Sequence, residues 1–298
     1  MMENNTAATG SRSEYKKHSL WTDVWIRLRK NTIAVIAIIV FLCILIVCLS
    51  APLIYDYDED IVQPDISRQM QAPSKEHILG CDEIGRDILA RIIWGGRITI
   101  IVSFCALGIA FIIGIVLGTV AAFYGGWAET IIMRIIDIIM SVPSVLLMIT
   151  LATLIKPSIP NLTFVVAFGL IPNQARIIRG QALQVIDQEF IKAARVQGAS
   201  DFRIIVNHIL PNALSPIITT TILDIAYAVM TISTLSFLGL GVQQPNPEWG
   251  TMLNSGRQYL RQAWHMSTFP GVALTITLMA LTLIGDGLRD ALDPRMKR

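Results

Sequence analysis

The sequence predicts an all-α polytopic membrane protein with six transmembrane helices. Of its 298 residues 53% are hydrophobic and only 15% are charged, whereas an average soluble domain is about 25% charged. The mean hydropathy is +0.57. The hydrophobic residues also gather into uncharged runs, most of which reach the ~20 residues that a helix needs to cross ~30 Å of hydrocarbon. A soluble helical bundle does not explain so many runs of this length.

The first predicted span, residues 31–55, follows a polar and basic N-terminal tail, residues 1–30. Trp21, Trp25 and a cluster of Lys and Arg mark the end of this span that faces the cytoplasm. A cleaved signal peptide is the rival interpretation, but its apolar region covers only ~7–15 residues, fewer than the uncharged run found here. We therefore expect the span to be retained.

Residues 56–97 form the longest expected extracytoplasmic loop. Its acidic first part, YDYDEDIVQPD, is interpreted as a solvated face rather than a Ca²⁺ site, because it lacks the glycine and the terminal Glu of an EF-hand loop. Farther along, Ile84, Ile88 and Ile92 recur at every fourth position, which suits an interfacial helix leading into the second span. Cys81 has no partner cysteine in this loop, so no intrachain disulfide is expected there.

The other five spans lie within residues 98–285. Gly114 and Gly118 give the second span the small-residue face that is typical of close helix packing. Arg134 and Asp137 stand one turn apart at the start of the third span, where we expect them to pair. The loop before the last span contains Trp249, expected at the membrane interface. The predicted spans are residues 98–128, 138–155, 157–175, 211–240 and 262–285.

Between the fourth and fifth spans lies a polar stretch, residues 187–211, DQEFIKAARVQGASDFRIIVNHILP. Phe190, Ala193, Ala194 and Gln197 are spaced i, i+3, i+4 and i+7, so a short helix would present them on one face of mostly small residues. Such a face allows another protein's surface to approach closely. The alternative is an amphipathic loop lying on lipid headgroups.

The same stretch carries helix stop and start signals. Gly198 stands where a helix C-terminus commonly needs a left-handed residue, and Ser200 can cap a second short helix that ends before Pro211. The distribution of Lys and Arg predicts the side of the membrane on which residues 187–211 lie. With the N-terminus inside, the inside segments carry 16 of these residues and the outside segments 8. We therefore expect this stretch in the cytoplasm, together with both termini and the C-terminal tail of residues 286–298.

Several motifs resemble those of one transporter family. The polar stretch contains two alanines, a glycine four residues after the second alanine, and Leu-Pro twelve residues beyond that glycine. This pattern resembles the EAA loop of ABC importer permeases. Lys192 stands where that family usually has Glu, and His208 where it usually has Ile. The remainder resembles the second permease subunit of the dipeptide, oligopeptide and nickel branch, from about residue 20 to the end. Its motifs are GCDEIGRD (80–87), FYGGW (123–127), LSFLGLG (235–241), PEWGTML (247–253) and GDGLRDALDP (285–294).

The resemblance implies a type I ABC importer permease fold in a multi-pass cell-membrane protein. It implies four partners besides membrane lipid: a homologous second permease subunit, two ABC ATPase subunits and an extracytoplasmic substrate-binding protein. The cargo expected first is a di- or oligopeptide, with nickel or a metal chelate as the alternative. By resemblance, the residues that couple to the ATPases are Phe190, Lys192, Ala193, Ala194, Arg195, Gly198, Ala199, Leu210 and Pro211.

The chain carries no motif for chemistry of its own. It lacks G-x-x-x-x-G-K-[ST], H-E-x-x-H, G-x-S-x-G and C-x-x-C. We expect no catalytic residue, metal or cofactor in this chain, with ATP and Mg²⁺ used by the partner ATPases. The net charge of only +2 argues against nucleic acid as a partner. A passive channel or an intramembrane enzyme is the competing class of function, and an enzyme would need paired catalytic groups within the spans.

Asp224 is the one carboxylate deep in a predicted span, about 13 residues into the fifth. A charge there costs several kcal/mol unless it is paired, protonated or facing water. Asp224 is therefore a candidate for the translocation pathway, where it would contact a peptide's N-terminal amine or another cation. The alternative is a structural hydrogen bond to Ser, Thr or Tyr, such as Thr219 or Tyr227.

Overall fold

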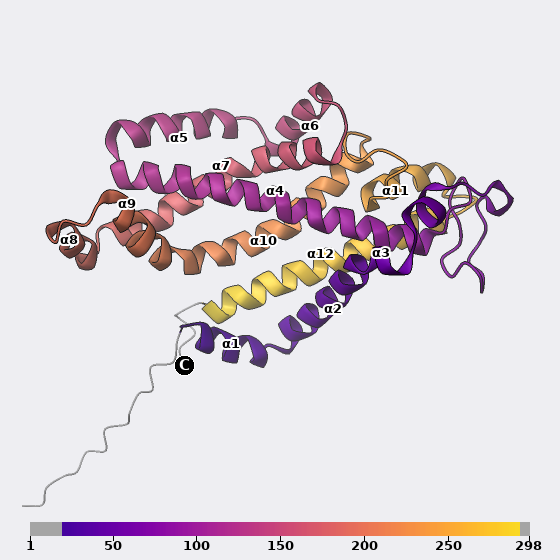
Figure 1. The fold of residues 1–298 in the computed structure, drawn as a ribbon, viewed down its shortest axis with the longest axis horizontal. Helices are drawn as coiled ribbons and strands as arrows, with labels where there is room; N and C mark the ends of the chain where they lie inside the picture. Colours follow the sequence, from indigo (N-terminus) through magenta and orange to yellow (C-terminus); the bar gives the residue numbers. More distant parts are fainter. Residues whose placement is uncertain (1–19, 293–298) are drawn as a thin grey trace, which may run out of the picture.

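The structure is a bundle in which the longest helices run in one common direction (Figure 1). This computed structural model describes residues 20–292, and contains no strand within them. The side chains of residues 20–24, Ser215 and Thr219 lie outside the description, as do residues 1–19 and 293–298. The expectations for the side chains of Trp21 and Thr219, and for residues 1–19 and 293–298 of the two predicted tails, therefore fall outside the described part of the molecule.

The helices follow one another with short connections, except for two irregular segments, residues 69–87 and residues 238–248. The elements are α1 (Leu20–Lys30), α2 (Thr32–Leu49), α3 (Ala51–Ile54), the π-helical η1 (Tyr57–Val62), the 3-10 helix η2 (Ile66–Arg68), α4 (Ile88–Tyr124), α5 (Gly126–Met140), α6 (Ser144–Leu154), α7 (Ile159–Ile186), α8 (Glu189–Val196), α9 (Asp201–Ile204), the π-helical η3 (Ile205–Ile209), α10 (Leu210–Phe237), α11 (Trp249–Gly256), the 3-10 helix η4 (Arg257–Tyr259) and α12 (His265–Leu292).

Four described helices have the length and composition to cross a membrane: α2, α4, α12 and the Pro216–Phe237 part of α10. A fifth span is obtained if α5 and α6 are counted as one broken span. The fourth predicted span, residues 157–175, corresponds to α7, which has 28 residues but carries Gln174, Arg176 and Arg179 in its second half. The membrane class is thus confirmed, while the count of six is not.

The third span is not the continuous helix predicted for residues 138–155. α5 already begins at Gly126, the chain breaks after Met140, and α6 leaves at an angle of 83°. Pro143 explains the break, because proline cannot donate its backbone N–H and disfavours helical geometry in the residue before it. The prediction was wrong here because it weighed the uncharged run and not its proline.

The second span is a single helix of 37 residues, α4. Asp87 caps its start, where its carboxylate accepts a hydrogen bond from the backbone N–H of Ala90 at 2.9 Å. The expected interfacial helix is wrong, because Ile84 precedes the helix and both Ile88 and Ile92 are buried in the protein. They pack in a cluster with Trp249 from α11.

α4 and α7 lie side by side through the middle of the bundle (Figure 1). A Cβ atom on Gly114 would lie 2.7 Å from the Cβ of Gln174, and one on Gly118 would lie 2.6 Å from the carbonyl oxygen of Ala175. Only glycine allows this approach at these two positions. The close packing predicted from the glycines of α4 is confirmed. The main hydrophobic core lies beside this contact and includes residues of α4, α6, α7 and α10.

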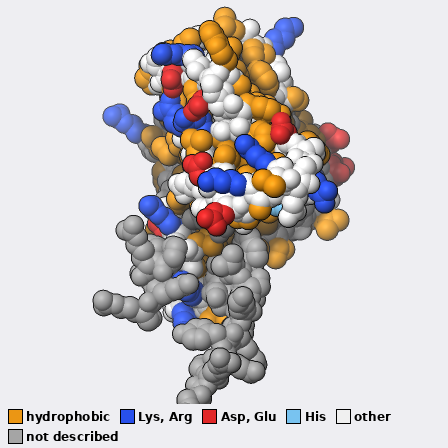
Figure 2. Space-filling model, turned by 90° about the vertical axis from the view of Figure 1, so that its left-hand side faces the viewer, with side chains coloured by type: hydrophobic (Ala, Val, Ile, Leu, Met, Phe, Trp, Pro, Cys, Tyr) orange, Lys and Arg blue, Asp and Glu red, His pale blue; other side chains and the backbone are white. Residues whose placement is uncertain are grey.

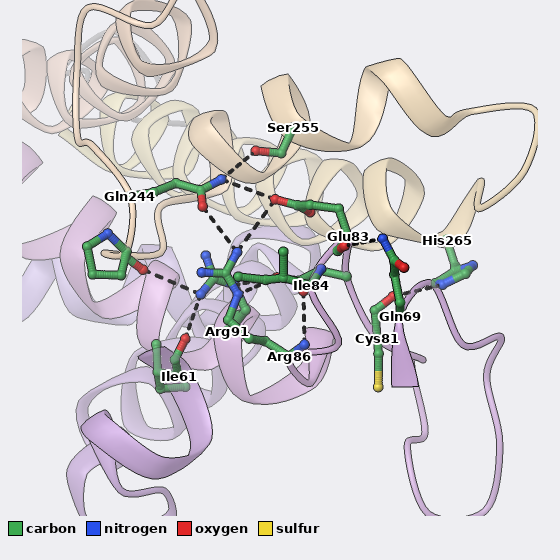
Figure 3. A network of polar contacts seen from close by, with 12 residues as sticks. Ile61, Gln69, Cys81, Glu83, Ile84, Arg86, Arg91, Gln244, Ser255 and His265 are labelled. Carbon is green, nitrogen blue, oxygen red and sulfur yellow. Dashed lines mark hydrogen bonds and ion pairs between the residues drawn. The ribbon is translucent and has the colours of Figure 1, made fainter. Parts of the chain in front are cut away.

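The end of the bundle that carries α11 is closed by a polar network (Figure 3). Arg86, which is 3% exposed, donates through Nε to Asp82 at 2.7 Å and through Nη2 to the side-chain oxygen of Gln244 at 3.2 Å. Arg91 donates to the carbonyl oxygen of Ile61 at 2.7 Å. The motif GCDEIGRD thereby ties the loop that precedes α4 to the segment that precedes α11.

Trp249 lies inside this end of the molecule, not at the membrane interface as predicted. Its indole N–H donates to the carbonyl oxygen of Ile92 at 2.9 Å, and its side chain is 1% exposed. The neighbouring Glu248 is also buried, and accepts hydrogen bonds from the hydroxyl groups of Thr99 and Ser233. The motif PEWGTML therefore anchors α11 to α4 and α10.

The acidic part of the loop agrees with the expected solvated face, because Asp56, Asp58, Glu59 and Asp60 are exposed. Cys81 is a free and buried cysteine. The carboxylate of Asp56 caps η1 by accepting hydrogen bonds from the backbone N–H groups of Asp58 and Glu59. Within residues 20–292 no three or more His, Cys, Asp or Glu side chains are grouped so that they could hold a metal ion.

Candidate coupling surface and pathway pocket

The polar stretch folds into two short helices separated by a turn, α8 and α9. α8 ends because Gly198 has a φ of +78°, a left-handed conformation that favours glycine. Behind the turn, the backbone N–H of Ala199 donates to the carbonyl oxygen of Ala194 at 3.1 Å. Ser200 caps α9 by accepting a hydrogen bond from the N–H of Arg203 at 3.4 Å. The predicted turn and cap are confirmed.

The second short helix does not end before Pro211. α9 passes through η3 into α10, which begins at Leu210. Pro211 stands in the first turn of α10, directly after the π-helical η3. The polar stretch is therefore joined to α10 without a break, and a displacement of α9 would act directly on that helix.

One face of α8 is buried against the bundle. Ile191 and Ala194 pack in a cluster with Ala182 of α7 and with Ile204 and Ile209. The predicted exposed face is therefore wrong for Ala194, while Phe190, Ala193 and Gln197 are exposed as expected. The physical reason is the large Ile191, which buries more apolar area than an alanine and so determines which side of α8 turns inward.

Apolar side chains project from the opposite side of these two helices. Val196 is 89% exposed, Phe202 76% and Phe190 44%. Together with Ala193, these residues are called the α8–α9 tip below. Figure 2 views this end of the molecule and shows hydrophobic side chains at the surface among basic and acidic ones. A cluster of this kind, exposed outside the bundle, suits contact with another protein.

The residues predicted for coupling occupy different depths. The guanidinium of Arg195 lies 5.0 Å from the ring centroid of Phe123, so this rim charge also packs on the end of α4. Sequence reasoning missed Val196 and Phe202, although Val196 follows Ala193 at the helical spacing i+3. Of the predicted residues, Phe190, Lys192, Ala193, Arg195, Gly198 and Pro211 are exposed, Ala199 and Leu210 are half-buried, and Ala194 is buried.

Asp224 lies on a pocket of about 300 Å³. Its carboxylate oxygen Oδ2 accepts a hydrogen bond from Nε2 of Gln174 on α7 at 2.6 Å. The predicted alternative partner Tyr227 instead shares a hydrogen bond with the hydroxyl of Ser144 at 3.0 Å. The pocket is formed at the bend between α5 and α6, and by α7 and α10. It is lined by Ile139, Met140, Val142, Pro143, Ser144, Leu147, Gly169, Leu170, Pro172, Asn173, Asp224 and Tyr227.

Two ion pairs connect α5 to α7. Asp137 pairs with Arg176 at 2.6 Å, and Glu129 pairs with Arg179. The expected pairing of Arg134 with Asp137 is wrong, because Asp137 pairs with an arginine from the adjacent helix. All five side chains line one wide pocket of about 490 Å³. Spacing along one helix identified the carboxylate but not its partner from another part of the chain.

Comparison with known proteins gives consistent matches over nearly the whole chain. Residues 114–298 match the family described as "Binding-protein-dependent transport system inner membrane component". Residues 19–73 match the "N-terminal TM domain of oligopeptide transport permease C".

Two curated relatives are similar over almost their full length. A dipeptide transport system permease protein of Alkalihalophilus pseudofirmus is 39% identical over 284 residues, 95% of this chain and 93% of the relative. A glutathione transport system permease protein of Pectobacterium atrosepticum is 39% identical over 277 residues, 93% of this chain and 92% of the relative.

Among solved structures, an inward-facing conformation of the MetNI methionine ABC transporter is similar in fold. The TM-score is 0.55 at 19% sequence identity, and the match covers 69% of this chain and 98% of that chain. A second crystal form of the same transporter gives a TM-score of 0.54. This likeness concerns the fold alone, and agrees with the type I permease fold expected from the sequence motifs.

Proposed function

The chain belongs to the family of binding-protein-dependent transport system inner membrane components, and on this premise we propose that it is the permease subunit of an ATP-driven importer of di- or oligopeptides. The relatives described above at 39% identity are permeases for dipeptides and for glutathione, itself a small peptide, which supports this class of cargo. Nickel or a metal chelate is the alternative cargo that the sequence motifs left open.

The observation that carries the proposal is the α8–α9 tip. Exposed apolar side chains of Phe190, Val196 and Phe202 project from helices that are anchored behind them by Ile191 and Ala194. A protein partner can bury the exposed face, and each large apolar side chain that it buries contributes about 1.5–3 kcal/mol. We assign this partner as an ABC ATPase subunit. Lys192, Arg195 and Gly198 belong to the same coupling surface, as do Ala193, Ala199, Leu210 and Pro211.

In this proposal the tip transmits motion rather than carrying out chemistry. Two ATPase subunits bind and hydrolyse ATP with Mg²⁺, and this chain holds neither. Closure of the ATPases displaces α8, which packs against α7, and α9, which continues into α10 through η3. Because α7 and α10 both line the pocket beside Asp224, their movement changes access to it. A homologous second permease subunit completes the pathway, and an extracytoplasmic binding protein delivers the cargo.

The proposed orientation has both termini in the cytoplasm. In the described part of the chain, α1 and the end of α12 lie toward the end of the bundle that carries α8 and α9 (Figure 1). Leu28 of α1 and Ala291 of α12 pack in one cluster. The network around Arg86 lies toward the opposite end, which would then face the binding protein.

The test is whether the ATPase subunits co-purify with variants of the tip. Val196→Asp and Phe202→Asp place a charge where an apolar contact is proposed, without disturbing a buried residue. We expect both variants to reach the membrane at the wild-type level but to retain less than a tenth of the ATPase subunits. Ile66→Asp is the matched control, because Ile66 is 75% exposed and lies in the loop before α4. Wild-type recovery of the ATPases with both tip variants would contradict the proposed coupling surface.

A further inference from the structure

The pocket beside Asp224 has a mostly apolar wall and a few polar groups. Most of its wall is apolar and comes from the bend between α5 and α6 and from α7, whereas its polar groups are Asp224, Tyr227, Ser144 and Asn173. Its volume of about 300 Å³ lies at the lower end of the range for pockets that bind small ligands. The pocket therefore offers one carboxylate in otherwise largely uncharged surroundings.

Within the described part of the chain, no basic side chain pairs with that carboxylate. The hydrogen-bond donor found for Asp224 among the described residues is the uncharged amide of Gln174. An ionised carboxylate has about four acceptor positions, so one amide leaves most of this capacity unused. A carboxylate in a low-dielectric setting favours a cation strongly when one can reach it.

The polar groups around Asp224 are held in place. Gln174 is buried, so the hydrogen bond from its side-chain amide holds the carboxylate of Asp224 in a fixed position. Tyr227 stands one turn after Asp224 on α10, and its hydroxyl is bonded to Ser144 of α6. This bond ties the part of the wall after the bend to α10. An ammonium group in the pocket would find a carboxylate and the aromatic ring of Tyr227, which attracts cations through its face.

We propose that Asp224 is a specificity-determining residue that binds the protonated amine of the cargo during its passage through the permease. This inference rests on the proposed function and adds a chemical selection to it. A free N-terminal amine is protonated for the most part at pH 7, and it satisfies the acceptor capacity that Gln174 leaves open. The apolar wall formed by residues such as Leu147 and Leu170 accepts an adjoining side chain.

The variant Asp224→Asn separates this role from a structural one. Asparagine has nearly the same shape, and its side-chain oxygen can still accept the hydrogen bond from Gln174. Only the negative charge is lost. Asp286→Asn is the matched control, because it removes an exposed carboxylate that lies outside the pocket, on α12.

The first measurement concerns charge selection in the pocket and needs no cargo. Asn173 is exposed and lines the pocket, so Asn173→Cys is a reporter in a background where all four native cysteines are replaced. In membranes that contain the complete transporter, its reaction rates are measured with a cationic and an anionic methanethiosulfonate reagent. The ratio of the two rates is divided by the same ratio for a free thiol. We expect this normalised ratio to be about ten with Asp224 and close to one with Asp224→Asn.

The second measurement is uptake of labelled dialanine by the complete transporter, with matched membrane levels and saturating binding protein. Asp224→Asn is expected to reduce uptake at least tenfold, while Asp224→Glu retains most of it and Asp286→Asn changes nothing. Basal ATP hydrolysis is expected to stay at the wild-type level in Asp286→Asn, because Asp286 lies outside the pocket.

The outcomes are distinct. An unchanged reagent ratio in Asp224→Asn overturns the inference, because the pocket then has no charge selection. A changed ratio with wild-type dialanine uptake also overturns it, because the cargo then does not use the site. If the wild-type transporter imports no peptide, the proposed peptide cargo fails, and amine recognition with it. The reagent ratio then still decides whether the pocket selects cations.

Discussion

Replacing Arg86 with methionine is expected to loosen the loop that precedes α4 without unfolding the bundle. The substitution leaves the carboxylate of Asp82 buried and removes the bond to Gln244. Breaking a buried ion pair costs about 3–5 kcal/mol. In this variant Nε of Arg91 still lies 3.4 Å from the same carboxylate oxygen of Asp82. We therefore expect a cost at the lower end of this range, about 3 kcal/mol.

Hydrogen exchange measures this change in the segment concerned. The backbone N–H of Met70 donates to the carbonyl oxygen of Asp82, and that of Cys81 to the carbonyl oxygen of Gln71. These amides exchange when the loop opens. A loss of about 3 kcal/mol in the opening free energy raises their exchange rates about 100-fold. Amides in the middle of α7 are expected to keep their rates.

Arg68→Met is the control, because the ion pair between Arg68 and Asp65 is about half exposed and is therefore expected to contribute little to stability. An increase below threefold in Arg86→Met would refute the assignment of the network as the anchor of this loop. A similar increase throughout α7 would show that the substitution unfolds the whole protein instead.

Three further predictions concern packing, reactivity and the sides of α8. Gly118→Val is expected to destabilise the protein by about 2 kcal/mol, since its side chain would collide with α7, while Gly108→Val, which faces open space, changes the melting temperature little. Burial raises the pKa of the Cys81 thiol to about 11, so its maleimide reaction rate in a single-cysteine variant should still rise about tenfold per pH unit from pH 7 to pH 9; a plateau near pH 8.5 would contradict this. Ala194→Asp should abolish accumulation in the membrane, whereas Ala193→Asp should accumulate normally and lose only the ATPases, as compared by immunoblot and co-purification.

Local signals in the sequence were sufficient for the turn after α8. Gly198 and Ser200 act through their own backbone and side-chain chemistry, so the C-terminal turn and the cap follow without knowledge of the rest of the fold. The glycines of α4 likewise indicate a close contact with another helix. The motifs could identify the family for the same reason, since each is a short run of neighbouring residues.

Features that depend on distant residues were not accessible in this way. Asp137 pairs with Arg176, and Trp249 is buried against Ile92. Nothing in the spacing along the chain indicates either contact. The inward direction of Ala194 depends on the cluster that receives Ile191, which is assembled from several helices. Pro143 is a local signal for the break between α5 and α6. The prediction missed the break because it relied on the long uncharged run that contains this proline.

Import into vesicles that contain the complete transporter, with labelled dialanine and nickel offered separately, tests the proposed function most directly. We expect accumulation of dialanine that requires ATP hydrolysis, and its loss in Phe202→Asp at a matched membrane level. Accumulation of nickel alone would move the cargo to metal. Accumulation of dialanine without ATPase subunits would indicate a passive channel, and wild-type import by Phe202→Asp would contradict coupling through the α8–α9 tip.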